Sequence, residues 1–75
     1  TVFDIKLILK SAIEKLASSI IVCHNHPSGN PKPSEQDIRI THKLKEASQL
    51  FEISLLDHII ITDSECYSFA DSGSL

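Results

Sequence analysis

The fold of this chain turns on one stretch, His24-Asn25-His26-Pro27-Ser28-Gly29-Asn30-Pro31-Lys32-Pro33-Ser34-Glu35-Gln36-Asp37. An apolar run, Ile20–Cys23, comes immediately before it, and a segment with helical periodicity follows it. Side chains at positions i and i+2 of a β-strand point to the same face, so a strand that stays extended through His26 would place the imidazoles of His24 and His26 side by side. Asp37 would approach them from the first turn of the next helix. The stretch therefore predicts a strand–loop–helix junction where three polar side chains converge.

The residue types at this junction favour a metal site. Two imidazole nitrogens and one carboxylate oxygen, with room for a water, form a typical catalytic zinc set. The same ligands also accept other divalent ions. A simpler interpretation of Ser34-x-x-Asp37 is a capping box at a helix start, and the two histidines could lie at a strand end without a metal. Capping alone does not account for two histidines and a rigid loop beside the acid, so the combination favours metal binding.

The spacing of these residues also resembles a known motif. His-x-His, seven residues, Ser, two residues and Asp is the pattern of the JAMM (JAB/MPN) metalloproteases, and the matching positions here are His24, His26, Ser34 and Asp37. The letters around them are similar to the RadC-like bacterial branch of that family. Two later segments, Leu56–Ile60 and Tyr67–Phe69, also resemble that branch. The resemblance covers nearly the whole chain, residues 1–75.

The resemblance implies a partial JAB/MPN domain with a cytidine deaminase-like α/β architecture. It implies a zinc-dependent metallopeptidase-like hydrolase, in which a metal-bound water attacks a peptide or isopeptide carbonyl. The zinc ligands would be His24, His26 and Asp37, and Ser34 would be the catalytic residue that helps to stabilise the oxyanion. The substrate implied is a peptide or a protein.

One element of the family pattern is missing. A glutamate on a strand upstream of the first helix activates the water in the family, whereas the acids before His24 here are Asp4 and Glu14. Glu14 falls inside a predicted helix. The chain also contains no methionine. We therefore expect this sequence to be a piece of a longer protein that lacks the N-terminal strands and the general base.

The periodicity of apolar residues predicts two helices and three strands around this junction. The predicted elements are a helix within Phe3–Ala17 capped by Asp4, a strand at Ser18–Cys23, an irregular loop at Pro27–Pro33, a helix from Glu35 to about Phe51 capped by Ser34, and strands at Ile53–Thr62 and Cys66–Phe69. The strand–helix–strand portion predicts a right-handed βαβ unit, and the last two strands predict a hairpin. We expect a small mixed sheet with helices on both faces.

The sequence also predicts which side chains of these elements face the interior and which lie at the surface. The inward stripe of the second helix is expected to consist of Ile38, Thr41, Leu44, Ala47 or Ser48, and Phe51. Polar residues inside an apolar strand require partners. Asp57 and His58 are adjacent and face opposite ways, so at most one of them can orient a ligand histidine, and the sequence does not decide which. His42 is expected to be a surface residue. Cys23 and Cys66 are expected to be reduced, buried thiols.

Composition limits the remaining function classes. A net charge of −3 without a cluster of Lys or Arg gives no basic footprint for nucleic acid. A DNA-repair-associated protein, a label long attached to the RadC-like branch, is therefore a weaker alternative than a non-catalytic MPN-type interaction module. The consecutive His-Asn-His letters also resemble HNH nucleases, but the motif residues of those nucleases are dispersed, so three adjacent letters carry almost no evidence for one.

No stretch is apolar enough to cross a bilayer, and residues 1–4 do not resemble a signal peptide, so we expect a cytoplasmic protein without membrane contact. Homo-oligomerisation is left open.

Overall fold

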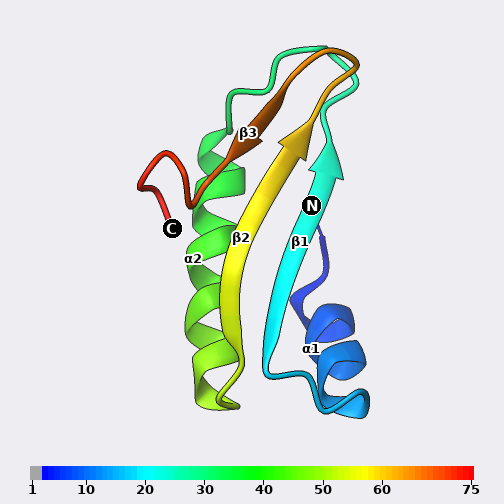
Figure 1. Cartoon of the computed structure of the whole chain (residues 1–75), viewed down its shortest axis with the longest axis vertical. Coiled ribbons are helices and arrows are strands. Elements are labelled where there is room, and N and C mark those ends of the chain that lie inside the picture. Colours follow the sequence, from blue (N-terminus) through cyan, green and yellow to red (C-terminus); the bar gives the residue numbers. More distant parts are fainter. Residues whose placement is uncertain (1–2) are drawn as a thin grey trace.

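The computed structural model describes residues 3–75; Thr1 and Val2, at the N-terminal stretch considered above for a signal peptide, lie outside the described residues. The elements follow in the order α1 (Ile5–Glu14), β1 (Ser19–Asn25), α2 (Glu35–Leu50), β2 (Ser54–Ile61) and β3 (Cys66–Ser68). Asp4 caps α1 by accepting a hydrogen bond from the Lys6 amide, as expected. The predicted small α/β fold with a mixed three-stranded sheet is confirmed (Figure 1).

The sheet has the order β1-β2-β3, with β1 parallel to β2 and β2 antiparallel to β3. Helix α2 makes the crossover between the two parallel strands and packs along β2, whereas α1 lies near the start of β1 (Figure 1). Strand β1 continues through Asn25, two residues beyond the predicted end. The amide of His26 still donates to the Ile61 carbonyl at 3.0 Å, so the chain remains tied to the sheet at His26.

The pairing of β1 with β2 contains one irregularity. Ile20 pairs with Leu55, but the next residue, Ile21, pairs with Asp57, so Leu56 is an extra residue in β2. An extra residue reverses the alternation of side chains along the rest of the strand. As a result Leu55 and His58 are both buried, and His58 points to the face where α2 packs. The bulge thereby decides that His58, and not Asp57, faces the histidines of β1.

The buried stripe of α2 differs from the predicted one. The buried residues are Asp37, Thr41, Leu44 and Ser48, whereas Ile38 and Phe51 are 37% and 55% exposed. The prediction is correct for Thr41 and Leu44 and wrong for Ile38 and Phe51. The helix is turned so that Asp37 faces the strand, and residues 4, 7 and 11 positions later share that side. The polar contact at the helix start therefore sets which residues are buried along its length.

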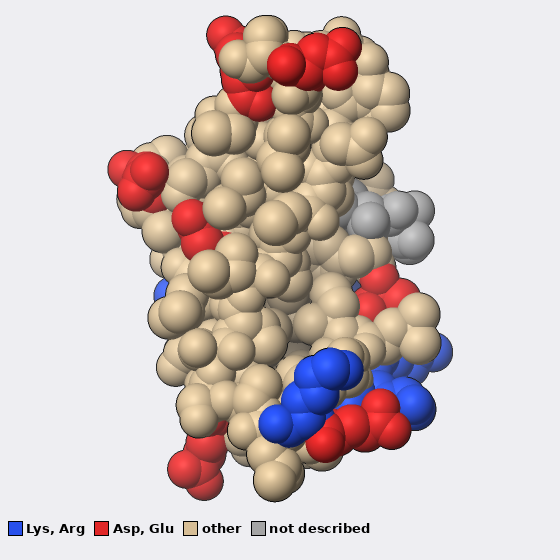
Figure 2. All heavy atoms as spheres, turned by 45° about the vertical axis from the view of Figure 1, so that its right-hand side comes forward, with Lys and Arg blue, Asp and Glu red and all other residues tan. Residues whose placement is uncertain are grey.

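One face of the sheet is open within residues 3–75, which differs from the expected helices on both faces. The apolar side chains of Ile21 and Ile61 are 56% and 43% exposed, and Cys23 is also exposed. The ring of Phe3 packs edge-on against His58, with centroids 5.5 Å apart, which places the start of α1 on the same side as α2. On the side visible in Figure 2, charged side chains lie at the two ends and along the margins, and the centre is uncharged.

The predicted burial of the two cysteines is wrong for the same reason. Cys23 and Cys66 are free thiols, and both are exposed. Cys66 is paired with Ile61, whose side chain is also exposed on the open face. Cys23 faces away from the histidines, as expected, but within the described chain nothing covers it. Neither helix within this part of the chain combines the length and the apolar character that a membrane crossing requires.

Asp57 ties β2 to the C-terminal segment. Its carboxylate accepts hydrogen bonds from the amide of His58, the amide of Ala70 and the hydroxyl of Ser68. Burial raises the pKa of Asp57, but the hydrogen bonds from Ser68, Ala70 and His58 outweigh burial, so its pKa lies below the ordinary value of 3.8. Asp57 is therefore a structural residue on the side of β2 opposite to His58.

Replacement of Asp57 with alanine is expected to lower the free energy of unfolding by about 2 kcal/mol at neutral pH, because three donors lose their acceptor. A depressed folded-state pKa stabilises the fold above the ordinary value of 3.8 and loses that contribution as the pH falls through the folded value. Urea denaturation measures the difference in the free energy of unfolding between the wild type and Asp57→Ala. This difference should be smaller near pH 3 (roughly the range in which the carboxyl titrates) than at neutral pH. Asp63→Ala, an exposed acid in the hairpin turn, is the control and should change stability by less than about 0.5 kcal/mol. An equal loss at both pH values would contradict this account.

Candidate metal centre

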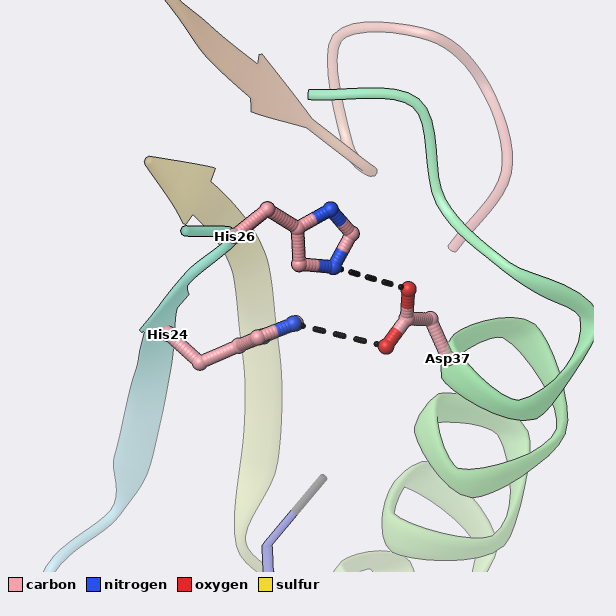
Figure 3. Close-up of side chains that lie close together, drawn as sticks. All are labelled: His24, His26 and Asp37. Atoms are coloured by element: carbon pink, nitrogen blue, oxygen red, sulfur yellow. Dashed lines mark ion pairs between the residues drawn. The ribbon is translucent and has the colours of Figure 1, made fainter. Parts of the chain in front are cut away.

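Three of the side chains singled out in the sequence converge at the end of β1. His24 and His26 project from the strand end toward Asp37, which comes from the first turn of α2 (Figure 3). Nε2 of His24 lies 3.4 Å from Oδ1 of Asp37, and Nε2 of His26 lies 3.2 Å from Oδ2. One nitrogen or oxygen atom from each of the three residues lies within 4.8 Å of the others. The predicted convergence of these residues is therefore present in the structure.

A capping box places Asp37. Its amide donates to the Ser34 hydroxyl at 3.1 Å, and Oδ2 of its carboxylate accepts from the Ser34 amide at 2.7 Å. The capping interpretation and the convergence with the histidines are both correct, because one oxygen accepts from the cap while the carboxylate as a whole faces the strand. Ser34 itself is exposed. Its hydroxyl accepts from the helix and keeps its own proton available.

The loop after β1 orients His26. Gly29 adopts a φ of 85°, a left-handed conformation suited to glycine, and its amide donates to the His26 carbonyl. The loop then returns so that the Asn30 carbonyl lies 2.9 Å from Nδ1 of His26. A carbonyl only accepts, so Nδ1 carries a proton and donates it. Nε2 of His26 is then the ring nitrogen that faces Asp37.

His24 is held from its other side. Its Nδ1 lies 2.8 Å from Nε2 of His58, while its own Nε2 is buried without a hydrogen-bond partner. That nitrogen is the one nearest to Asp37. A buried polar atom without a partner is uncommon and calls for an explanation. Here the atom faces a carboxylate and the Nε2 edge of the second histidine.

The charges of the site follow from burial. Asp37 is only 1% exposed. Burial raises the pKa of Asp37, but hydrogen bonds from Ser34 and the two nearby histidines more than offset it and hold this pKa below its usual range. Burial lowers the pKa of His24 despite the attraction of Asp37, and it lowers the pKa of His58 to about 4. At neutral pH the carboxylate of Asp37 therefore faces the uncharged imidazole of His24.

These donors fit a divalent cation. The ring nitrogens of His24 and His26 lie 3.4 and 3.2 Å from the two different oxygens of Asp37, and one donor atom from each of the three residues lies within 4.8 Å of the others, which brings all three within reach of a single cation. Without a cation, the unpartnered nitrogen of His24 would face an anion. His24, His26 and Asp37 together supply two nitrogens and one oxygen, which leaves a fourth position for water or substrate.

The structure adds two residues that the sequence analysis did not assign to the site. His58 is fully buried and contacts His24, and Thr41 is fully buried and contacts His58. The sequence left open whether His58 or Asp57 orients a ligand histidine, because it gives no sign of the bulge in β2. Thr41 was expected only as part of the inward stripe. His42, by contrast, is exposed, as predicted.

The acids do not complete the expected catalytic set. Among residues 3–75, the candidate cluster of His24 and His26 includes no carboxylate other than Asp37. Glu14 pairs with Lys10 on the exposed side of α1, and Glu35 pairs with Arg39 on the exposed side of α2. Neither is therefore in a position to act as a general base. The roles of His24, His26, Asp37 and Ser34 themselves remain predictions.

Comparison with known proteins gives a consistent family assignment. A family model described as a RadC-like JAB domain matches residues 1–74. The chain is 45% identical over 73 residues to a UPF0758 protein of Flavobacterium johnsoniae, which covers 97% of this chain and 32% of the relative. It is 51% identical over 73 residues to a UPF0758 protein of Porphyromonas gingivalis, with 96% and 32% of the two chains covered. The chain therefore spans about a third of the length of these curated relatives.

Proposed function

The chain belongs to the RadC-like JAB domain family, and we propose that it provides the metal-binding part of a zinc-dependent hydrolase that cleaves a peptide or isopeptide bond. The observation that carries the proposal is that the Nε2 atoms of His24 and His26 both face the buried carboxylate of Asp37, with one donor atom from each residue within 4.8 Å of the others. A structural capping box explains the position of Asp37 but does not explain why His24 has a buried nitrogen without a partner.

In this proposal each residue has a separate task. His24, His26 and Asp37 hold the cation, which when bound polarises a carbonyl and lowers the pKa of a water molecule. The Ser34 hydroxyl keeps its proton while accepting from the Asp37 amide, so it can donate to an oxyanion that develops beside the metal. Asp37 is assigned to hold the cation and its pKa lies below the usual range, so the proposal needs a separate general base. A glutamate outside residues 3–75 takes that role.

The substrate and the location belong to the same proposal. The substrate is a peptide or a protein, because the chemistry suits an amide carbonyl. A cytoplasmic location suits the two exposed free thiols, since an oxidising compartment favours disulfides between such groups.

The test is the zinc content of the purified protein, compared with that of a His26→Ala variant. We expect about one zinc per chain in the wild type and less than about a tenth of that in the variant, because removal of one of three ligands leaves an incomplete set. His42→Ala is the matched control, since His42 is an exposed histidine on α2 away from the cluster. It should keep the full zinc content. Equal zinc in the wild type and in His26→Ala would sink the proposal.

A non-catalytic interaction module is the second candidate. It is favoured by the absence of a second carboxylate from the cluster in the described residues. Hydrolysis of a peptide or isopeptide substrate by the zinc-loaded intact protein, lost in Ser34→Ala and in His26→Ala, separates the two. Zinc binding without any hydrolysis would favour the module.

A further inference from the structure

A chain of three short contacts runs from the candidate metal centre into the core. Nδ1 of His24 lies 2.8 Å from Nε2 of His58, and Nδ1 of His58 lies 2.6 Å from the Thr41 hydroxyl. The Thr41 hydroxyl in turn donates to the Asp37 carbonyl at 2.6 Å. Thr41 and His58 are both fully buried, so no water competes for these contacts. The chain starts at one proposed ligand and ends at the backbone of another.

The order of donors and acceptors along this chain is fixed by its far end. A backbone carbonyl only accepts, so the single hydroxyl proton of Thr41 goes to Asp37. The hydroxyl oxygen must then accept the proton of His58 Nδ1. If His58 also supplied the proton to His24, its ring would carry a charge in a fully buried position, which is costly. His58 Nε2 therefore accepts from His24 Nδ1.

This order determines the state of the metal-facing nitrogen. When Nδ1 of a neutral imidazole carries the proton, Nε2 is left as a bare lone pair. In His24 that atom is the buried nitrogen without a partner, 3.4 Å from the Asp37 carboxylate. In His26 the Asn30 carbonyl is the partner of Nδ1, so Nε2 is the nitrogen that this ring turns toward Asp37.

We propose that His58 and Thr41 are positioning residues that select the tautomer of His24 in which Nε2 can bind a metal. This inference rests on the proposed metal site and extends it to two residues outside the ligand set. Partners of this kind fix the ring orientation of a ligand histidine, and their loss typically weakens metal affinity by about 10–100-fold. We call the contacts that link His24, His58, Thr41 and the Asp37 carbonyl the relay. The His58 ring stacks on Phe69, with centroids 4.6 Å apart and planes 2° from parallel, and this stack holds the His58 ring in the orientation that the relay needs.

The test changes the far end of the relay and leaves the ligands untouched. Thr41→Val keeps the shape of the side chain but removes the acceptor of the His58 proton. His58 can then turn its proton toward His24, which favours the wrong His24 tautomer. Zinc affinity, measured by competition with a chelator on the intact protein, should fall by about 10–100-fold in Thr41→Val. Thr41→Ser restores the hydroxyl and should stay within about threefold of the wild type.

A second readout does not need the metal. Nitrogen chemical shifts of ¹⁵N-histidine-labelled, metal-free protein distinguish a protonated from a bare ring nitrogen. We expect His24 protonated at Nδ1 in the wild type and in Thr41→Ser, and a mixture of tautomers in Thr41→Val. His58→Phe, which can keep the stack on Phe69, should show the same loss of preference. Circular dichroism of each variant checks that the fold is retained.

The two proposals fail in different ways. If the wild type binds zinc and Thr41→Val binds it equally well, the relay is wrong and the metal site stands. If His24 carries its proton on Nε2 in the metal-free wild type, the relay is also wrong. If the wild type binds no zinc, the proposed function fails, and the tautomer of His24 still decides whether the relay exists.

Discussion

Replacement of Asp37 with asparagine is expected to abolish tight zinc binding and, at the same time, to make the metal-free protein more stable. Zinc affinity should fall by more than about 100-fold, beyond the effect of losing an indirect partner. The reason for the gain in stability is that the amide oxygen, in the place of Oδ2, can still accept from the Ser34 amide, while the NH₂ group, in the place of Oδ1, donates to the unpartnered Nε2 of His24. A buried anion that faces the lone pair of His24 is thereby replaced by a hydrogen-bonded neutral group.

The expected gain in the free energy of unfolding is about 1–2 kcal/mol, the typical value of a buried hydrogen bond and of a relieved buried charge. It is measured by urea denaturation with a chelator present at about pH 8, where ordinary imidazoles are uncharged. Glu35→Gln is the matched control, because Glu35 is an exposed acid in the same helical turn. It should change neither zinc affinity nor stability appreciably. A metal-free Asp37→Asn variant that is less stable than the wild type would mean that the carboxylate is satisfied without a cation.

Phe69→Ala is expected to cause the largest loss of stability in the chain. Phe69 is fully buried, stacks on His58 and packs edge-on with Tyr67. Truncation of a buried phenylalanine costs about 3–5 kcal/mol. The core of a chain of this size seldom supplies more than about 3–5 kcal/mol in total. The variant should therefore be largely unfolded at 25 °C without metal.

Circular dichroism and urea denaturation of the metal-free protein measure this effect. Phe51→Ala is the control, because Phe51 is the C-cap residue that follows α2, and its side chain is 55% exposed. Its cost should be well under that of Phe69→Ala, about 1 kcal/mol or less. If Phe69→Ala and Phe51→Ala lower the free energy of unfolding equally, the stack on His58 is not part of the stabilising core. Added zinc that restores the fold of Phe69→Ala would show that metal binding contributes to folding.

The open face of the sheet has a consequence for handling this chain. The apolar side chains of Ile21 and Ile61 lie exposed beside two free thiols. The chain covers about a third of the relatives it resembles. Zinc and stability measurements on the intact protein are therefore preferable to measurements on an excised piece.

The sequence by itself determined the elements and their junction, because those depend on neighbouring residues. The continuous, β-branched apolar run before His24, the cap at Ser34 and the prolines between them are local signals, and they placed β1, the loop and α2 correctly. The spacing of His24, His26 and Asp37 was enough to predict their convergence. The family followed from the same letters.

Only the tertiary structure decided which side chains complete the site. The extra residue Leu56 in β2 turns His58 toward His24 and Asp57 away, and this depends on the pairing of two strands more than 30 positions apart. Asp37 sets the rotation of α2, so Thr41 meets His58 while Ile38 and Phe51 turn outward. Exposure of Cys23 likewise depends on what packs over the sheet. Strand register and helix rotation are set by contacts between distant segments, and local periodicity carries no information about them.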